Sequence, residues 1–219
     1  LVRVSAAGHE VSNDDALRDL GAVANALTFR YNGDAFKRVV YTESHDEVAN
    51  GKARVPQEVD PDDPTGYYAR KRSTLGAGLV FTSPGIPMIF QGQEFLEGGW
   101  FRDTVALDWD LDEEFHGIVK LYRDLIRLRR NTGGATAGLT GQGTWLYHNN
   151  DDANLIAFQR WRDHGPGDDV VVVANLSAVT LLGYRIGFPA EGRWKVVFNS
   201  DSTAYGDDFG SRLAHDVTA

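Results

Sequence analysis

The spacing of hydrophobic residues along the chain changes near residue 134. Before that point, apolar residues at helical spacing predict helices over residues 14–31 and 112–130, and a helix is also expected over residues 66–81, where basic residues give way to small and apolar ones. The last helix is the clearest, because acidic residues lie in its first turn and arginines in its last, which suits the helix dipole. We therefore divide the chain into an α/β part, residues 1–133, and an all-β part, residues 134–219.

In the all-β part, apolar and polar residues alternate in short runs that are separated by turn residues. Leu182, Tyr184, Ile186 and Phe188 are an example, because alternate positions place all four on one face of a strand. This rhythm is typical of a small β-sandwich. Strands are expected at residues 145–147, 155–161, 170–175, 182–188 and 194–199.

Two short apolar runs in the α/β part stop abruptly at polar residues. The runs are residues 38–43 and 86–91, and the helix predicted over residues 66–81 lies between them, which is the order of a parallel strand–helix–strand unit. Residues that follow such strands build the active face of a parallel barrel, so they are candidates for a site. These residues are His45, Asp46, Glu47, Gln93 and Glu94.

Alternative interpretations apply to the first of these motifs. A His-Asp pair by itself is more often an exposed turn than a functional site. Glu43 and Glu47 flank the pair, but alternate strand positions point apart, so at most one of them is expected to face the site with Asp46. The polar, Pro-rich residues 49–65 that follow are expected to form a long surface loop.

Composition and charge narrow the class of protein. The 219 residues are 42% hydrophobic and 24% charged, as in a globular protein, and the longest apolar runs are too short to span a membrane. The net charge of -9 would repel a phosphate backbone, so no nucleic-acid partner is expected. The absence of cysteine excludes disulfides and thiolate metal sites and suits a reducing compartment, here the cytoplasm. The six histidines show no paired-ligand spacing, and we expect neither a metal nor a cofactor.

Three ordered segments resemble the α-amylase superfamily of glycoside hydrolases. Residues 41–52 are similar to its seventh-strand motif, and the form SHDEV followed by Gly-Lys resembles that of glycogen (1,4-α-glucan) branching enzymes, whereas typical amylases carry Asn before the His-Asp pair. Residues 84–95 resemble the eighth strand, and residues 199–206 resemble part of the C-terminal all-β domain.

The resemblance implies a fold for each part of the chain. Residues 1–133 would be the last strands and helices of a (β/α)8 TIM barrel, and residues 134–219 the small β-sandwich domain that follows it, without its final strand. Too few residues precede the strand at 38–43 for three strand–helix units, and the start Leu1-Val2-Arg3-Val4 lacks a Met. We therefore expect a C-terminal fragment.

The resemblance also implies roles for individual residues. Asp46 would be the carboxylate that stabilises the transition state by gripping the 2- and 3-hydroxyls of the reacting glucose, and His45 would donate a hydrogen bond to the same sugar. The nucleophile and the acid/base would lie upstream, on the fourth and fifth strands. Glu10 does not follow the pattern of the acid/base, so we assign neither role and expect the fragment alone to be inactive.

Other polar and aromatic residues have two interpretations each. Glu47, Lys52, Gln93 and Glu94 are candidates for substrate binding, although Gln93 and Glu94 also suit loop packing. Arg54 could meet glucan hydroxyl groups beside Lys52, and a solvated basic pair is the alternative. Aromatic rings can stack on sugar faces or anchor a core or loop. The aromatic candidates are Trp100, Phe101 and Trp109.

Three functions remain open at this stage. The first is 1,4-α-glucan branching by a retaining enzyme, through a covalent glucosyl-enzyme intermediate, on glycogen, amylose or a maltooligosaccharide. The second is an amylase-type hydrolase that uses the same residues with water as the acceptor. The third is a non-catalytic glucan-binding module formed by the all-β part.

Overall fold

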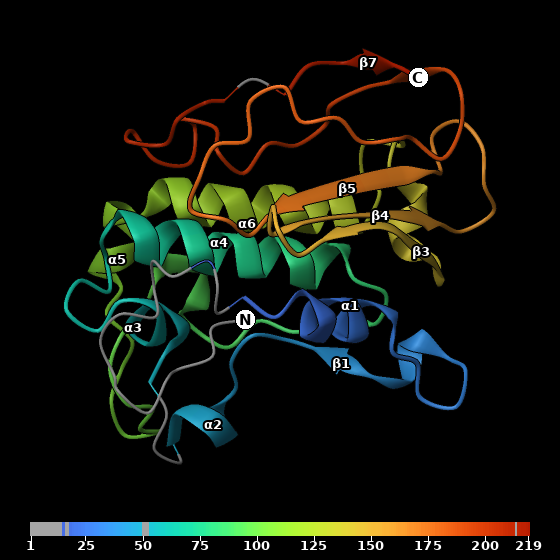
Figure 1. Ribbon diagram of the computed structural model, residues 1–219. Coiled ribbons are helices and arrows are strands. Elements are labelled where there is room, and N and C mark those ends of the chain that lie inside the picture. Colours follow the sequence, from blue (N-terminus) through green and yellow to red (C-terminus); the bar gives the residue numbers. More distant parts are fainter. Residues whose placement is uncertain (1–14, 16–17, 50–52, 213) are drawn as a thin grey trace.

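The computed structural model describes residues 15, 18–49, 53–212 and 214–219 (Figure 1). The predictions that concern Leu1-Val2-Arg3-Val4, Glu10 and Lys52 lie outside the described residues. Helices and strands of the α/β part are α1 (Leu20–Thr28), β1 (Val39–Val40), α2 (His45–Ala49), α3 (Val55–Val59), α4 (Tyr67–Thr82), β2 (Ile86–Pro87), α5 (Asp110–Glu114) and α6 (His116–Arg129). Those of the all-β part are β3 (Gly143–Asn150), β4 (Leu155–Trp161), β5 (Val170–Asn175), β6 (Arg193–Trp194) and β7 (Val217–Thr218).

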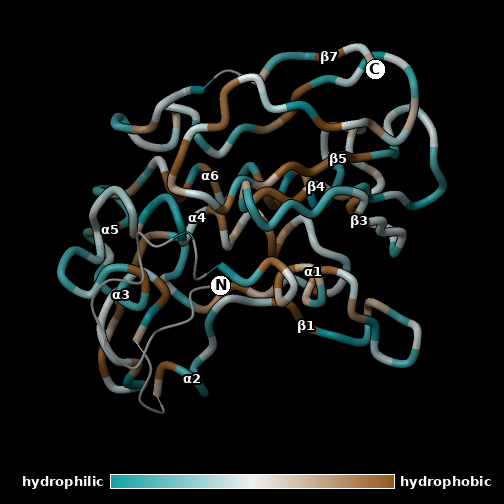
Figure 2. Tube along the Cα trace, in the orientation of Figure 1, coloured by the Kyte–Doolittle hydropathy of each residue, from teal (hydrophilic) through white to brown (hydrophobic). Residues whose placement is uncertain are grey.

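Helices α4 and α6 lie side by side in the middle of the molecule, with α1 and β1 on one side and β7 with the C-terminal segment on the other (Figure 1). One buried cluster joins α4 and α6 to Tyr205 and Phe209 of the C-terminal segment. A second joins Val23 and Leu27 of α1 to Ile156 and other residues of the sheet. Hydrophobic segments accordingly concentrate where the strands meet the helices (Figure 2).

The two strands of the α/β part are parallel neighbours, as their sequence order predicts. Val39 pairs with Ile86 and Val40 with Pro87, and α4 lies in the connection between them. Both strands are shorter than the predicted runs of residues 38–43 and 86–91. The N–H of Ile86 donates to the carbonyl oxygen of Arg38 and the N–H of Met88 to that of Val40, and the two strands pair no further.

Two other predictions for this part need correction. The expected loop at residues 49–65 contains α3, because Pro56 falls in the first turn of that helix, where a missing N–H costs nothing. The single helix expected over residues 112–130 is two helices, α5 and α6, with a break at Phe115. Just after the break, Gly117 packs so closely on Tyr205 that a Cβ would lie 2.6 Å from its carbonyl oxygen.

In the all-β part, β3, β4 and β5 form an antiparallel sheet in that order, and β6 pairs with β7. The strand predicted at residues 182–188 is wrong: those residues form no ladder, and Leu182 is 83% exposed. The strand predicted at 194–199 is confined to β6. An alternating pattern makes a strand only where a partner strand accepts its backbone hydrogen bonds.

The turn between α4 and β2, residues 81–85, presents five consecutive backbone carbonyl groups, and each accepts a hydrogen bond from an arginine. Arg129, at the end of α6, donates to the first, third and fifth. Arg160 of β4 donates to the second, and Arg38, directly before β1, donates to the fourth. Because the C-terminus of a helix carries partial negative charge, these cations stabilise it. We call the three side chains the arginine clasp.

Arg160 is the member of the clasp that joins the two parts of the chain. Its side chain is completely buried, and it also donates to carbonyl groups of the all-β part, at Gly141 (2.7 Å) and Gly143 (3.0 Å). Burial, followed by the charge of Arg129, lowers the pKa of Arg160 to about 9, so the guanidinium remains protonated at neutral pH. The clasp thus fixes the sheet against the turn that leads into β2.

Arg160→Met should test the clasp. The substitution removes the donors of the carbonyl groups at Thr82, Gly141 and Gly143 while keeping an unbranched side chain, so we expect the free energy of unfolding in urea to fall by about 3 kcal/mol. The matched control is Arg185→Met, at an exposed arginine, which should change the free energy by less than about 0.5 kcal/mol. Equal effects of the two substitutions would contradict this role for Arg160.

Two ion pairs dock the C-terminal segment on α4. Lys71 contacts Asp201 at 2.5 Å, and Arg70 contacts Asp208 at 2.5 Å. The hydrogen bonds from Arg70 lower the pKa of Asp208. For Asp201, burial raises the pKa, but the hydrogen bonds from Lys71 and from two backbone N–H groups outweigh burial and lower it.

Acid should therefore weaken this docking. Because the pKa of each carboxyl group is lower in the folded than in the unfolded state, its contribution to stability is fully present above the unfolded pKa of about 4 and is lost as the pH falls through the folded pKa. Urea unfolding should show a free energy that declines below about pH 4, and Asp201→Asn should make the decline shallower. An identical pH dependence for wild type and variant would refute the assignment.

Candidate functional site

The His-Asp motif forms the start of a short helix at the end of β1. The N–H of Val48 donates to the carbonyl oxygen of Ser44 (3.1 Å), and the Val48 side chain is completely buried. His45 and Asp46 point outward, with side chains 65% and 79% exposed and 3.1 Å between Nε2 and Oδ1. The motif thus places an imidazole and a carboxylate together on the surface.

Glu43 and Glu47 were expected to point apart because they would alternate along one strand. That premise is wrong, because residues 45–49 are helical. Glu43 is buried, with 2% of its surface exposed, and Glu47 is half-buried. The turn into α2, and not strand alternation, sends the two side chains to different surroundings.

Glu43 forms a buried ion pair with Arg54. Arg54 Nη1 lies 3.1 Å from Glu43 Oε1, and both side chains are 3% exposed. Glu43 Oε2 accepts a hydrogen bond of 2.6 Å from the N–H of Val55. Burial raises the pKa of Glu43, against the lowering effect of the Val55 N–H and of Arg54. Arg54 therefore faces the interior, and both predictions for it, contact with glucan hydroxyl groups and a solvated basic pair, are wrong.

Gln93 joins the second motif to the first. Its Oε1 accepts from the N–H of Phe90 (3.2 Å), and its Nε2 donates to Oγ1 of Thr42 (2.5 Å). The side chain is buried, so the structure places it in the packing between the two strand ends. Its loop-packing interpretation is the one that the geometry favours.

Glu94 lies beside a second buried polar group. Its Oε2 is buried and has no hydrogen-bond partner in the described part of the chain. Burial raises the pKa of Tyr122 and the charges of Glu43 and Glu94 raise it further, while the neighbouring Gln93 side chain opposes the rise. Gly92 permits the turn into this region, because it has φ of 82° and a Cβ there would lie 2.6 Å from the Cβ of Glu97.

Aromatic side chains border the His-Asp helix. The ring of Phe101 stands edge-on to His45, 6.3 Å between centroids, and to Phe90 at 5.3 Å. Trp100 and Trp109 are 60% and 66% exposed, which does not fit a core position. Phe101 is therefore brought to the motif, while the two tryptophans offer open ring surface.

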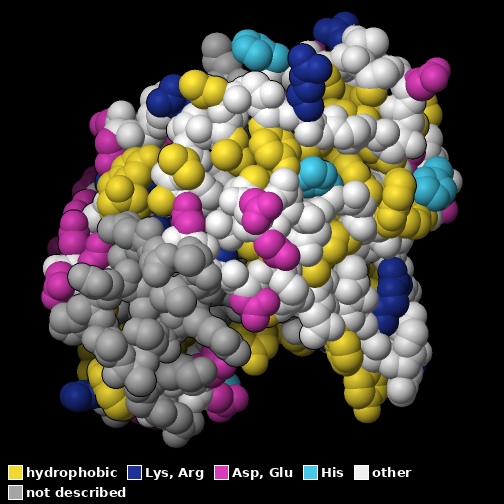
Figure 3. Space-filling model, viewed as in Figure 1, with side chains coloured by type: hydrophobic (Ala, Val, Ile, Leu, Met, Phe, Trp, Pro, Cys, Tyr) yellow, Lys and Arg dark blue, Asp and Glu magenta, His cyan; other side chains and the backbone are white. Residues whose placement is uncertain are grey.

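Outside the two motifs, we searched the described residues for metal-binding groups, for membrane-spanning helices and for clusters of charge. Among residues 15, 18–49, 53–212 and 214–219, no group of three or more His, Asp or Glu side chains is placed to hold a metal ion. No helix of the described residues is long and apolar enough to cross a membrane. Acidic side chains gather around α5, at the left of the molecule (Figure 3).

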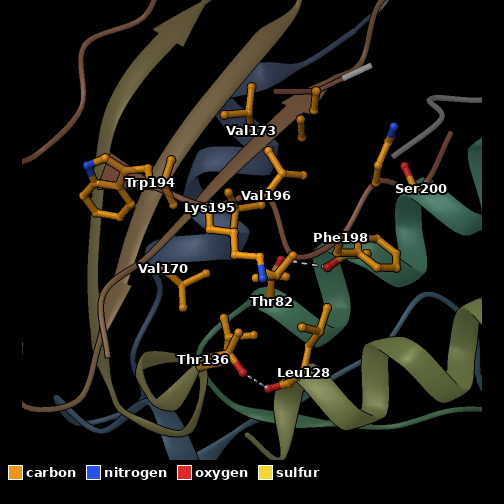
Figure 4. A pocket seen from close by; sticks show the side chains of 18 of the residues that line it. Thr82, Leu128, Thr136, Val170, Val173, Trp194, Lys195, Val196, Phe198 and Ser200 are labelled. Atoms are coloured by element: carbon orange, nitrogen blue, oxygen red, sulfur yellow. Dashed lines mark hydrogen bonds between the residues drawn. The ribbon is translucent and has the colours of Figure 1, made fainter. Parts of the chain in front are cut away.

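A cavity of about 410 Å³ lies apart from the His-Asp motif, between α4, α6, β5 and residues 194–200. Side chains such as Leu128, Val170, Val196 and Phe198 line it, and it shares no residue with α2 or the β2 end (Figure 4). It is an apolar gap between the helices and the C-terminal segment, and it holds none of the predicted site residues.

Known proteins that are similar in sequence to this chain come from one enzyme superfamily. Residues 145–218 match the family described as alpha amylase, C-terminal all-beta domain. A 1,4-alpha-glucan branching enzyme GlgB from Paraburkholderia xenovorans is 35% identical over 172 residues, which are 78% of this chain and 23% of that protein. The corresponding enzyme from Myxococcus xanthus is 34% identical over 199 residues, 87% of this chain and 26% of that protein. The chain belongs to the α-amylase superfamily.

A solved structure of this superfamily shows the same fold. The pullulanase of Anoxybacillus sp. LM18-11, solved in complex with maltotetraose, superposes with a TM-score of 0.60 over 93% of this chain and 29% of its own, at 21% identity. The chain spans about a quarter of the length of the curated relatives that it matches.

The buried pair of Glu43 and Arg54 is the feature of the site that the sequence did not reveal. Eleven positions separate the two residues, and no motif links a Glu at the end of a strand to an Arg in the next polar stretch. The one signal in the sequence was Glu43, an ionisable residue at the end of the apolar run 38–43, because a buried charge needs a buried partner.

Gln93→Leu should show that this amide is structural. It leaves the Phe90 N–H and the Thr42 hydroxyl without their partner, so we expect the free energy of unfolding in urea to fall by about 1–3 kcal/mol. Gln91→Leu, at an exposed side chain two positions away, is the control and should change it by less than about 0.5 kcal/mol. A neutral Gln93→Leu would move Gln93 back to the list of substrate-binding candidates.

Proposed function

We propose that this chain supplies the glucose-gripping face of an α-glucan-active retaining enzyme, most closely a 1,4-α-glucan branching enzyme. The observation that carries the proposal is the parallel pairing of β1 with β2, which brings the exposed His45 and Asp46 and the Gln93–Glu94 turn to the same ends of neighbouring strands. The similarity to branching enzymes over 78–87% of the chain supports it.

The proposed chemistry assigns Asp46 and His45 to the reacting glucose. A retaining enzyme uses a nucleophilic carboxylate and an acid/base about 5 Å apart, with an oxocarbenium-like transition state. Asp46 would hold the 2- and 3-hydroxyls as the ring flattens, and His45 would donate to the same sugar. Contacts that strengthen in the transition state raise the turnover number. Phe101, together with Trp100 and Trp109, would offer aromatic surface to the glucan.

We infer that residues 1–133 are the last strands and helices of a (β/α)8 barrel and that residues 134–219 are its C-terminal all-β domain. The parallel β1–β2 pair with α4 in the crossover supports the barrel. So does the apolar surface of these strands, because Val39 and Ile86 are each 49% exposed, which is the expected state of barrel strands without neighbours. The nucleophile and the acid/base would then come from other parts of the gene product.

Asp46→Asn is the direct test in the complete gene product that contains this chain. If Asp46 acts in the transition state, the turnover number on amylose should fall on the order of 100- to 1000-fold with little change in KM. Asp62→Asn, in the exposed loop before α4, should leave both unchanged. A near-normal rate for Asp46→Asn would remove Asp46 from the site.

The reaction type is read from the products of the same assay. Branching transfers the cleaved glucan to a 6-hydroxyl and forms one new α-1,6 linkage without a net gain of reducing ends. Hydrolysis, the second candidate, forms one reducing end for each bond broken. We expect α-1,6 linkages to predominate, and an excess of reducing ends would assign the hydrolase.

The 219-residue chain by itself should show no transfer or hydrolysis on amylose. Asp46 and His45 hold the sugar in this proposal, and neither breaks the glycosidic bond. Turnover by the purified chain, measured as reducing ends or α-1,6 linkages, would show that the nucleophile and acid/base lie within it.

A further inference from the structure

We propose that Glu43 and Arg54 are positioning residues, which fix the helix that bears His45 and Asp46 against the carboxyl end of β2. The inference rests on the proposed function, because it assigns the pair an effect on the glucan reaction. Both side chains are buried, so neither can touch a substrate and neither is a catalytic residue.

The Arg54 guanidinium contacts the ends of both strands. It lies 4.2 Å from the ring centroid of Phe90, and Nη1 donates to Oε1 of Glu43 (3.1 Å) and to the carbonyl oxygen of Gln91 (2.9 Å). Glu43 follows β1, while Phe90 and Gln91 follow β2. Arg54 therefore links the two motifs directly, beside the hydrogen bond from Gln93 to Thr42.

Glu43 closes the segment that contains α2. Its Oε2 accepts from the N–H of Val55, at the start of α3, so residues 43 and 55 are held together while α2 lies between them. Within α2, buried Val48 points inward and exposed Asp46 points outward. The position of the Asp46 carboxylate thus depends on where the pair holds the ends of this segment.

A displacement of about 1 Å can cost a factor of about 100 in rate even when it arises away from the chemistry. Loss of the pair should therefore reduce the turnover number more than it raises KM. A pair that only stabilised the fold would lower the unfolding free energy and leave the turnover number of the folded enzyme intact. The turnover number of the folded enzyme therefore distinguishes a positioning role from a purely structural one.

The experiment compares Glu43→Gln, Arg54→Met, Arg54→Lys and the double variant Glu43→Gln/Arg54→Met in the complete gene product, at a temperature where circular dichroism shows all to be folded. We expect each of the first two to lower the turnover number on amylose about 10- to 100-fold with less than a threefold change in KM. The turnover number of the double variant should be no lower than that of the less active single variant, because each substitution removes the same interaction. Arg54→Lys should restore part of the rate, because it keeps the charge.

Lys71→Met is the matched control. It breaks another ion pair of the chain, with Asp201 at 2.5 Å, on α4 and the C-terminal segment. It should lower stability and leave the turnover number within about twofold, since the ion pair of Lys71 joins α4 to the C-terminal segment and not to α2. If Glu43→Gln and Arg54→Met also keep the normal turnover number, the pair is structural and the inference is overturned.

Hydrogen exchange gives a readout that does not need activity. In Arg54→Met, amides of residues 44–49 should exchange at least about tenfold faster, while those of α6 keep their wild-type rates. Unchanged exchange in residues 44–49 would overturn the positioning role. An enzyme without activity on amylose whose exchange responds as expected would instead overturn the proposed function and leave the positioning of α2 standing.

Discussion

The arginine clasp on residues 81–85 is the interaction on which the arrangement of the two parts depends. Five consecutive carbonyl groups at the end of α4 need donors, and three guanidinium groups from separate regions of the chain supply them. A buried carbonyl without a donor costs as much as a lost hydrogen bond, so α6, β1 and β4 are all drawn to one turn. Because that turn leads directly into β2, the clasp fixes the strand from which the second motif emerges.

At the other end of the strands, polar side chains again control the packing. Glu43, Arg54 and Gln93 are buried, and their hydrogen bonds join the end of β1 to the end of β2. His45 and Asp46 lie at the surface, and Glu47 is half-buried. The polar cluster thus separates into buried side chains that join the two strand ends and side chains that are exposed to solvent.

Much of this could be predicted from local patterns. Helices α4 and α6, the strands β3 to β5 and the parallel order of β1 and β2 all follow from spacing and sequence order, and each is confirmed. Two of the failures have one kind of cause. Residues 182–188 alternate correctly but have no partner strand, and Arg54 looks like a surface base until its neighbours are known. Neither a ladder partner nor a buried counter-ion is encoded within a short window of sequence.

Patterns along the chain were enough to predict helices before residue 134 and short strands after it, to place His45 and Asp46 just beyond a strand, and to reveal the resemblance to the α-amylase superfamily, because these depend on neighbours along the chain. The tertiary structure alone decided that Glu43 pairs with Arg54, that Gln93 packs inward, and that Arg160 binds the turn after α4. Burial and hydrogen bonding between residues far apart in sequence are set by which surfaces pack together, and only the complete fold brings those surfaces into contact.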